Sequence, residues 1–511
     1  MPKNFIVFFS ILLLLGLVYA PVFLVPFAHY DDYGYFAWDA QHPHFRESVD
    51  RGRYLMGPIS SRYDLLVEKV EDLRKLRFLS LIYLSITAFV CYLWVRNYFH
   101  SWLSAFLFIV CIFTLPPFQI VMALGTGVLE MTAVFLSAAA ASLLRLSELS
   151  KSGGFLKAVC VAGAIFLFVS SLMIYQPAAM FYWVMVALFS LPFVTGTDKA
   201  LGKKIAQFGI IGVISMLIYA FIVSGISRLN NENSLLTTQY MLKLEWFFKD
   251  PLTSASNLWD IFPQLSRTYA VAGFILSAFV LYLFKEFAAK KKEKVFLLGV
   301  KVFLLLSLVF LSFSPNLLAK YNIGAYRCSL ALTPIILLFV LLAVQTWLSL
   351  IPSSKRNSVL MIILLCACLW GMYKANTNVL NYRVIPSFKE FSYIKDVLAR
   401  YDMSQYRRIV ILRPNHFPLE SQYRYDEFMI PTTYHFAFTP SIIKAALTEL
   451  GIESVIFRDF RWVNQWILKS RVRVETGEIS ERYLTVLYTT EEAPTLLADG
   501  DLIVDMRKIL L

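Results

Sequence analysis

Two adjacent carboxylates, Asp31 and Asp32, follow directly after the first long apolar segment, in the stretch PFAHYDDYGYFAWD (26–39). Carboxylates beside a bilayer are costly unless they are paired or used. Adjacent side chains of a helix or strand cannot point the same way. One carboxylate can therefore act as a general base while its neighbour orients an acceptor or binds a cation. The pair indicates acid–base chemistry at a membrane surface; the alternative is an ordinary solvated loop.

Aromatic side chains surround the pair: Tyr30, Tyr33 and Trp38. Sugar rings stack their C–H faces on aromatic rings, so these three residues are predicted to bind a carbohydrate substrate. The alternative is an aromatic belt at the bilayer interface, where Tyr and Trp are enriched.

Four cations are candidates for binding a phosphate. Arg51 and Arg53, in RGRYL (51–55), can offer forked donors to a phosphate. Arg327 stands at the start of a later apolar segment, with Lys320 nearby, where an outward cation can meet a lipid-linked phosphate leaving group. The alternatives are solvated or salt-bridged arginines, and snorkelling to lipid headgroups.

Three further polar residues lie at ends of apolar segments. Tyr175 and Gln176 are hydrogen-bonding groups in the turn IYQPAA (174–179), which otherwise is only a proline-containing turn at an interface. Glu130 is the most membrane-embedded acid of the chain, which makes it a candidate substrate-binding residue. A structural ion pair, for example with Arg327, explains Glu130 equally well.

No metal centre is predicted. His29, His42 and His44 have no spacing typical of a closed site, and no other cofactor is expected. A divalent cation, Mg²⁺ or Mn²⁺, on the carboxylates is an alternative that the sequence leaves open. Walker, GxSxG and zinc-protease motifs are absent from the sequence.

The composition shows what must position these residues. The 511-residue chain is 58% hydrophobic and 16% charged, with a mean hydropathy of +0.60, far more apolar than a soluble protein. This predicts a polytopic α-helical membrane protein whose partner is the lipid bilayer. The net charge is +13. The excess of Lys and Arg is interpreted as orientation signals in cytoplasmic loops, and no nucleic-acid partner is expected.

About eleven apolar segments are long enough to span a membrane, and the first is interpreted as a retained helix. They are 5–27, 77–95, 101–122, 126–145, 157–175, 178–195, 205–226, 264–284, 295–313, 327–350 and 357–374. With the N-terminus in the cytoplasm, every basic cluster between spans falls on the cytoplasmic side. The Asp pair, the turn at 175–177 and loops 28–76 and 227–263 then lie outside. Within loop 28–76, residues 60–78 are predicted to form an amphipathic interfacial helix.

The composition changes after residue 380, where no segment is long enough to span. Short β-like stretches (407–414, 453–460, 483–490) alternate with helix-like patterns (387–401, 441–450). We therefore predict a transmembrane catalytic domain, 1–380, and a small extracytoplasmic α/β domain, 381–511.

This arrangement resembles the GT-C glycosyltransferases, which use polyprenyl-phosphate-linked sugars. Within that class, DDYGYFAWDAQ…DRGRYL (31–55), YQ (175–176) and YR (326–327) are similar to the Gtr-type O-antigen glucosyltransferases. The resemblance implies that Asp31 or Asp32 deprotonates an acceptor hydroxyl, which attacks the anomeric carbon of a hexose on a lipid phosphate. Arg53 and Arg327 would stabilise the departing phosphate. It also implies a lipopolysaccharide-type glycan acceptor and a bacterial inner membrane with a periplasmic C-terminal domain.

Three other functions stay open. A flippase or transporter of lipid-linked saccharides should show an internal repeat and polar residues along its mid-span helices, and neither is found. A glycan polymerase or ligase usually relies on Arg and His in a large external loop. A membrane scaffold that binds a partner through residues 381–511 leaves the acidic pair unexplained.

Overall fold

The structure of the protein is a computed structural model. It describes residues 2–36, 51–99, 101–149, 154–195, 199–229, 240–288, 292–319, 322, 324–402, 408–412, 439–451, 460–462, 485–489 and 501–505. The side chains of Tyr30 and several residues at the ends of these segments are outside the description.

Apolar helices form most of the described chain. They are α1 (Pro2–Val18), α2 (Pro21–Leu24), α5 (Leu73–Val95), α6 (Trp102–Phe113), α7 (Pro116–Ala123), α8 (Gly127–Leu149), α9 (Gly154–Ile174), α10 (Gln176–Ala179), α11 (Phe181–Thr195), α12 (Lys199–Leu229), α15 (Leu265–Ala288), α16 (Lys292–Ser312), α18 (Leu332–Leu348) and α19 (Ser353–Val379). Short helices connect them: η1 (Tyr30–Phe36), α4 (Met56–Asp64), η2 (Val70–Asp72), α13 (Tyr240–Lys249), α14 (Pro251–Ser256), α17 (Ser314–Leu318) and η3 (Tyr326–Ser329).

Each predicted span corresponds to one or two apolar helices. The predicted number of eleven spans is not confirmed. Within the described residues, seven helices are long and apolar enough to cross a membrane, or up to eight if the bent pair α6–α7 is one span. Three further apolar helices are shorter: Asn4–Val18, Leu298–Ser312 and Leu332–Leu348. The bend of 62° between α6 and α7 lies at Pro116–Pro117, because proline cannot continue the hydrogen bonding of the preceding helix.

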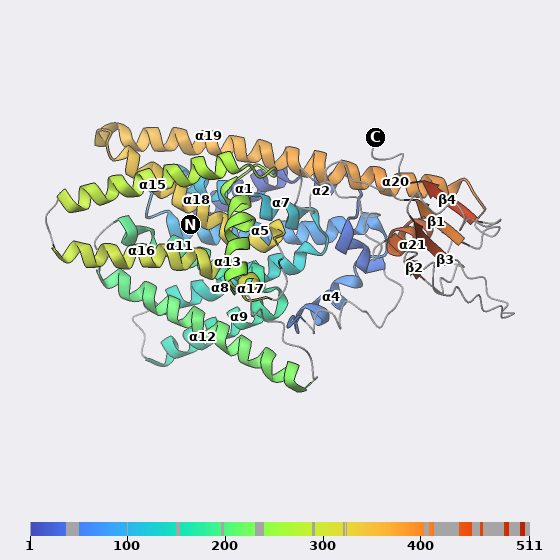
Figure 1. Cartoon of the computed structure of the whole chain (residues 1–511), viewed down its shortest axis with the longest axis horizontal. Coiled ribbons are helices and arrows are strands. Elements are labelled where there is room, and N and C mark those ends of the chain that lie inside the picture. Colours follow the sequence, from blue (N-terminus) through green and yellow to red (C-terminus); the bar gives the residue numbers. More distant parts are fainter. Residues whose placement is uncertain are drawn as a thin grey trace.

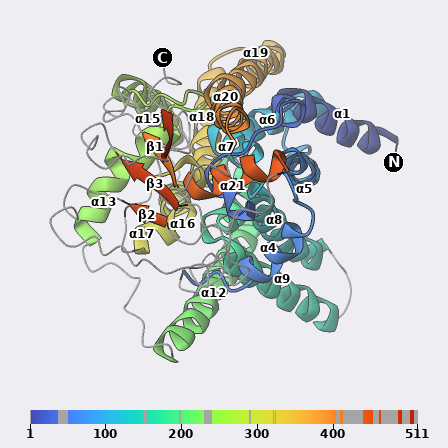
Figure 2. The same ribbon diagram turned by 90° about the vertical axis from the view of Figure 1, so that its right-hand side faces the viewer.

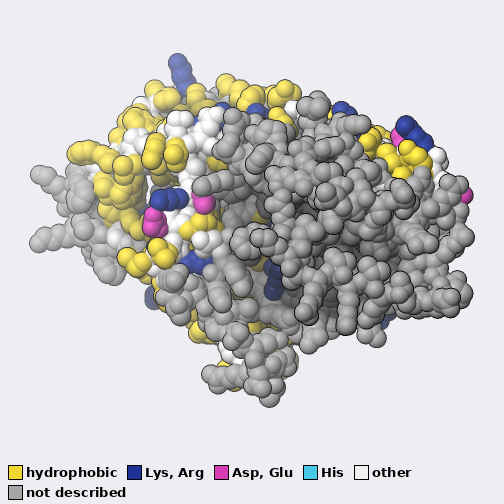
Figure 3. All heavy atoms as spheres, turned by 45° about the vertical axis from the view of Figure 1, so that its right-hand side comes forward, with side chains coloured by type: hydrophobic (Ala, Val, Ile, Leu, Met, Phe, Trp, Pro, Cys, Tyr) yellow, Lys and Arg dark blue, Asp and Glu magenta, His cyan; other side chains and the backbone are white. Residues whose placement is uncertain are grey.

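The helices divide into a buried centre and a lipid-facing periphery. α7 and α11 are almost completely buried, whereas α12 and α15 expose most of their apolar side chains. This is the pattern expected of helices that contact lipid rather than water. Figure 3 shows hydrophobic side chains over much of the described part of one face, with a small group of basic and acidic side chains among them.

The predicted interfacial helix over residues 60–78 is wrong in its extent. α4 ends at Asp64, the 3-10 turn η2 follows at Val70–Asp72, and α5 begins at Leu73. The side chain of Asp72 accepts hydrogen bonds from the backbone N–H groups of Glu68 and Lys69. This local turn competes with helical continuation, so the segment is two helices and not one.

One helix joins the membrane part to the C-terminal part. α19 continues through the π-helical turn η4 (Leu380–Val384) into α20 (Ile385–Ala399), a run of 47 residues, about 70 Å long and well beyond the thickness of a bilayer. Pro386 cannot donate a helical hydrogen bond, and in the π-turn the N–H of Ile385 instead donates to the carbonyl of Leu380. Figure 1 shows this helix running along the whole molecule to the strands.

The described C-terminal residues form a parallel sheet with one helix. Its strands are β1 (Arg408–Leu412), β2 (Phe460–Trp462), β3 (Thr485–Thr489) and β4 (Asp501–Asp505), in the order β2-β3-β1-β4. β1 and β3 lie inside predicted stretches, β2 overlaps its stretch only at Phe460, and β4 was not predicted. α21 (Thr439–Glu449) packs against α20, and Lys395 pairs with Glu449 at 2.7 Å.

Candidate active site

The two aspartates of the acidic pair point into different surroundings. Asp32 is fully buried and its carboxylate accepts a hydrogen bond from the buried guanidinium of Arg77 at 3.0 Å. Backbone N–H groups of Gly125, Thr126 and His29 also donate to this carboxylate, at 2.7, 3.2 and 3.2 Å. Burial raises the pKa of the Asp32 carboxyl, and the Arg77 charge and the amide donors oppose that shift. We call Asp32 with these donors the Asp32 anchor.

Arg77 ties three segments of the chain together. Its guanidinium donates to Asp32, to the carbonyl of Phe27 at 2.7 Å and to the carbonyl of Ala123 at 3.1 Å. It also lies 3.8 Å from the centroid of the Phe27 ring, a cation–π contact. Because every partner is buried, the anchor fixes η1 against the start of α5 and the end of α7.

The turn between α7 and α8 serves both Asp32 and Glu130. Gly125 and Thr126 hold Asp32, and α8 then begins at Gly127, which places Glu130 in its first turn. A Cβ on Gly127 would stand 1.9 Å from the carbonyl oxygen of Val121, so only glycine fits there. The same turn therefore orients the Asp32 anchor and positions Glu130.

Asp31 faces a second, more open group. Its carboxylate accepts a hydrogen bond from Arg327, and the same guanidinium nitrogen lies 3.8 Å from a carboxylate oxygen of Glu130. The side chains of Asp31 and Arg327 are 33% and 30% exposed, whereas Glu130 is 7% exposed. We call Asp31, Glu130 and Arg327 the acid–arginine cluster. It is partly open to a ligand, which the Asp32 anchor is not.

Neighbours on both sides hold Arg327 in place. Tyr326 is buried and donates to the carbonyl of Ile261 at 3.1 Å. The carbonyl of Cys328 accepts from Asn316 at 3.4 Å. Hydrogen bonds thus hold η3 in place on either side of Arg327, and the Arg327 side chain points toward Asp31 and Glu130.

A third group lies beside this cluster. The guanidinium of Arg53 donates to the side-chain oxygen of Gln176 at 3.2 Å and lies 4.4 Å from the ring centroid of Tyr175. The amide nitrogen of Gln176 donates to the carbonyl of Arg51 at 2.9 Å. The Tyr175 hydroxyl lies 3.8 Å from the sulfur of Cys328, next in sequence to Arg327. Tyr175 therefore connects the Arg53–Gln176 pair to the acid–arginine cluster.

The structure brings together six of the twelve predicted site residues. Asp31, Glu130, Arg327, Tyr175, Gln176 and Arg53 converge from segments far apart in sequence. Arg51 is exposed and contributes its carbonyl. Asp32 and Tyr33 lie in the interior, where the Tyr33 ring packs near Phe391 of α20. Trp38, Lys320 and the side chain of Tyr30 lie outside the described residues, as do His42 and His44.

Three residues of the site were missed from the sequence. Besides Arg77, the π-turn carries the buried Arg383, whose charge acts on Asp32. Ser387 of α20 lies 2.8 Å from the Nδ1 of His29. The only signal was a basic residue in or beside an apolar helix, at Arg77 and Arg383. The sequence does not distinguish such a residue from a solvated one.

Positive charge in this site is supplied by arginine. Within the described part of the chain, no group of three or more His, Cys, Asp and Glu side chains could hold a metal ion. Arg327 lies next to both carboxylates of the acid–arginine cluster.

No protein-family description matches the sequence, and a search of curated proteins finds no match. Among solved structures, ArnT from Cupriavidus metallidurans in the apo state is similar at 10% identity, over 85% of this chain and 88% of that chain, with a TM-score of 0.37. The same protein bound to undecaprenyl phosphate is 9% identical over 82% and 84%, with a TM-score of 0.38. At these TM-scores the likeness carries no conclusion about this chain.

Proposed function

We propose that this protein is an integral-membrane glycosyltransferase that moves a sugar from a polyprenyl-phosphate donor to a glycan acceptor at the extracytoplasmic face. The acid–arginine cluster carries this proposal. It joins a partly exposed carboxylate to a guanidinium where helix ends meet, in a chain built of apolar helices. Group transfer from a lipid phosphate needs these two components, a base for the acceptor and a positive group for the leaving phosphate.

The proposed step is a single displacement at the anomeric carbon. Asp31 takes the proton of the acceptor hydroxyl as the acceptor oxygen forms its bond to that carbon. The bond from the carbon to the phosphate oxygen breaks, and its electron pair leaves with the polyprenyl phosphate. Arg327 stabilises the negative charge that grows on the phosphate. One displacement inverts the anomeric configuration.

Arg327 must serve two anionic partners during this step. In the structure it pairs with Asp31 and lies near Glu130. A donor phosphate competes for the same guanidinium, which frees an oxygen of Asp31 to accept a hydrogen bond from the incoming hydroxyl. Glu130 is nearly buried and keeps the guanidinium within reach. Asp31 is therefore assigned as the base, Arg327 as the phosphate ligand and Glu130 as a positioning residue.

The neighbouring group is assigned to the donor. The guanidinium of Arg53 offers a second positive charge, and Gln176 and the ring of Tyr175 hold it. A forked guanidinium suits a phosphate. Tyr30, Trp38, Arg51 and Lys320 remain predicted substrate or phosphate ligands on sequence grounds alone, whereas the buried Tyr33 is not assigned to the substrate.

The positions of the basic loops support the proposed orientation of the site. Arg327 precedes the N-terminus of α18, whereas Lys285 and Arg356 gather at its other end, near Ser349. Lys and Arg in short loops favour the cytoplasmic side, which supports an extracytoplasmic acid–arginine cluster. The sequence motifs similar to Gtr-type enzymes support the finer proposal of a hexose donor, an O-antigen acceptor and a bacterial inner membrane. The proposed step does not use a divalent cation.

The test is mass spectrometry of the surface glycan from cells that carry wild type or Asp31→Asn, with membrane levels measured by immunoblot. We expect Asp31→Asn to be present at the wild-type level while the glycan lacks one sugar mass. Glu68→Gln is the matched control, because Glu68 is an exposed carboxylate in the same predicted external segment. An unchanged glycan in Asp31→Asn and in Arg327→Gln would contradict the proposal and favour transport of lipid-linked saccharides.

A further inference from the structure

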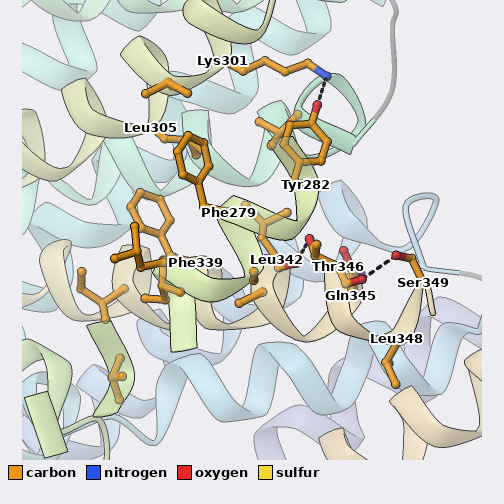
Figure 4. A pocket seen from close by; sticks show the side chains of 18 of the residues that line it. Phe279, Tyr282, Lys301, Leu305, Phe339, Leu342, Gln345, Thr346, Leu348 and Ser349 are labelled. Atoms are coloured by element: carbon orange, nitrogen blue, oxygen red, sulfur yellow. Dashed lines mark hydrogen bonds between the residues drawn. The ribbon is translucent and has the colours of Figure 1, made fainter. Parts of the chain in front are cut away.

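A large cavity lies between the peripheral helices, apart from the candidate active site. It has a volume of about 1110 Å³ and is lined by residues of α6, α11, α13–α16, α18 and the start of α19, together with the connection between α5 and α6. Most lining side chains are apolar. Figure 4 shows three of them, Phe279, Leu305 and Phe339, which come from α15, α16 and α18.

One end of this cavity is cationic. Lys285, Lys301 and Arg356 line it, and no carboxylate is found among the described lining residues. Lys285 donates to the hydroxyl of Ser349, and Arg356 donates to the carbonyls of Leu348 and Ser349 at 3.2 and 3.3 Å. The partners that these contacts give to Lys285 and Arg356 are neutral, so this end carries net positive charge.

Lys301 places a positively charged amine inside the helix bundle. It lies in the middle of α16, is only 5% exposed and donates to the Tyr282 hydroxyl at 3.1 Å, a contact that Figure 4 shows. The Tyr282 and Phe193 rings lie 5.7 and 5.9 Å from its amine. A lysine inside a membrane helix is costly unless it has a role. Its amine lines the cavity, so an anionic group in the cavity would offset that cost.

The cavity is long enough to hold an acyl chain. Thr268 and Lys285 both line it and lie 17 residues apart on α15, about 26 Å along a helix. That is close to the thickness of the whole hydrocarbon core of a bilayer, and an acyl chain of one leaflet, which covers about half of the core, fits within it. The space between its ends is lined by apolar side chains of α15, α16 and α18, which suits a long hydrocarbon chain and not a small polar ligand.

The cationic end is too far from the acid–arginine cluster to serve the same phosphate. Arg327 precedes the first turn of α18 and Ser349 follows its last residue. α18 has 17 residues, so the two ends are about 26 Å apart. A lipid whose phosphate contacts Lys285 and Arg356 therefore has its headgroup in the leaflet opposite the reaction.

We propose that this cavity binds an anionic phospholipid of the leaflet opposite the acid–arginine cluster. An acyl chain lies among the apolar side chains of α15, α16 and α18, and the phosphate is bound at the end formed by Lys285, Lys301 and Arg356. This lipid is distinct from the donor in the proposed reaction, and its binding does not depend on that function.

The test measures lipid binding by the purified full-length protein with native mass spectrometry. Phosphatidylglycerol and phosphatidylcholine with identical acyl chains are added in turn. We expect phosphatidylglycerol to bind at least tenfold more tightly. Lys301→Gln and Arg356→Gln should each weaken its binding about tenfold, because each removes a charged hydrogen-bond donor. Lys157→Gln, an exposed lysine on α9 outside the cavity, should change nothing.

A second variant tests the apolar part separately. Ala278 is buried and lines the cavity, so Ala278→Phe fills the space and should weaken binding of phosphatidylglycerol while all three cations remain. Gel filtration and thermal melting report whether each variant is folded. Equal binding of the two lipids by wild type, or wild-type binding by the folded Lys301→Gln and Ala278→Phe variants, would overturn the proposal. So would displacement of phosphatidylglycerol by equimolar polyprenyl phosphate, which would assign the cavity to the donor.

Discussion

The Asp32 anchor and the acid–arginine cluster are built from neighbouring residues and the same chemical groups, yet they differ in almost every physical respect. Asp32 is fully buried and accepts hydrogen bonds from three backbone amides and Arg77. Asp31 is one-third exposed and pairs with the guanidinium of Arg327, which also lies near Glu130. The first carboxylate has its acceptor positions occupied, whereas the second can exchange its partner.

This difference separates structural from chemical roles within one dipeptide. A buried carboxylate that is fully hydrogen-bonded stabilises its surroundings and cannot reach a substrate. A partly exposed carboxylate at an arginine can accept a proton when that arginine turns to another anion. In the proposed reaction Asp31 is the reactive carboxylate, whereas Asp32 fixes the geometry of η1.

The largest expected effect comes from breaking the anchor. Asp32→Asn places an amide donor among four hydrogen-bond donors and leaves Arg77 as an uncompensated buried charge. Removing one partner of a buried ion pair costs about 3–5 kcal/mol. We expect little folded protein in the membrane, measured by immunoblot and by thermal melting in detergent. Arg77→Met should behave similarly, because it leaves Asp32 unpaired.

The double variant Asp32→Asn with Arg77→Met sharpens this test. If the ion pair is the main contact, the double variant should recover part of the stability lost by either single change. Wild-type melting of Asp32→Asn would show that the carboxylate is not an anchor.

The next largest effect concerns the partly exposed aspartate. Asp31→Asn retains the size of the side chain and removes the base, so turnover should fall about 10²–10⁴-fold while the melting temperature changes little. Turnover is measured as release of polyprenyl phosphate by purified protein. Equal losses of stability in Asp31→Asn and Asp32→Asn would erase the distinction between the two aspartates.

Arg327 offers a graded test of the same cluster. Arg327→Gln removes the charge that stabilises the leaving phosphate, and turnover should fall about 10²–10³-fold. Arg327→Lys keeps the charge but loses the planar guanidinium with its several fixed donors, so its loss should be smaller. If Lys and Gln lower turnover equally, geometry and not charge is what the site requires.

Much of the site could be predicted from the sequence because its residues lie at helix ends. Spans that cross one bilayer bring their external ends to one level, so a polar residue at each end, such as Tyr175, Glu130 or Arg327, is a reasonable candidate. The division of labour between Asp31 and Asp32 could not be predicted, since it depends on how η1 is rotated against α5 and α20.

Similar physical reasons explain why Arg77, the π-turn and β4 were not predicted from the sequence. Arg77 stands among other charges at the start of α5, where a buried arginine looks the same as a solvated one. The π-turn around Arg383 follows from Pro386 only once α19 and α20 are known to be continuous. β4 (Asp501–Asp505) is short and begins and ends with aspartate, residues that are depleted in strands.

The smallest expected effect concerns Tyr175, which connects the third group to the acid–arginine cluster. Its ring lies under the guanidinium of Arg53, and among the described residues its hydroxyl contacts the sulfur of Cys328 at 3.8 Å. Tyr175→Phe keeps the ring and should leave donor affinity within about twofold, whereas Tyr175→Leu loses a cation–π contact of about 0.5–1 kcal/mol and should weaken donor binding a few-fold. Both variants should melt close to wild type, and donor affinity is measured by titration of purified protein. A larger loss in Tyr175→Phe than in Tyr175→Leu would show that the hydroxyl contacts the donor directly, and the third group would then belong to the acid–arginine cluster instead of lying beside it.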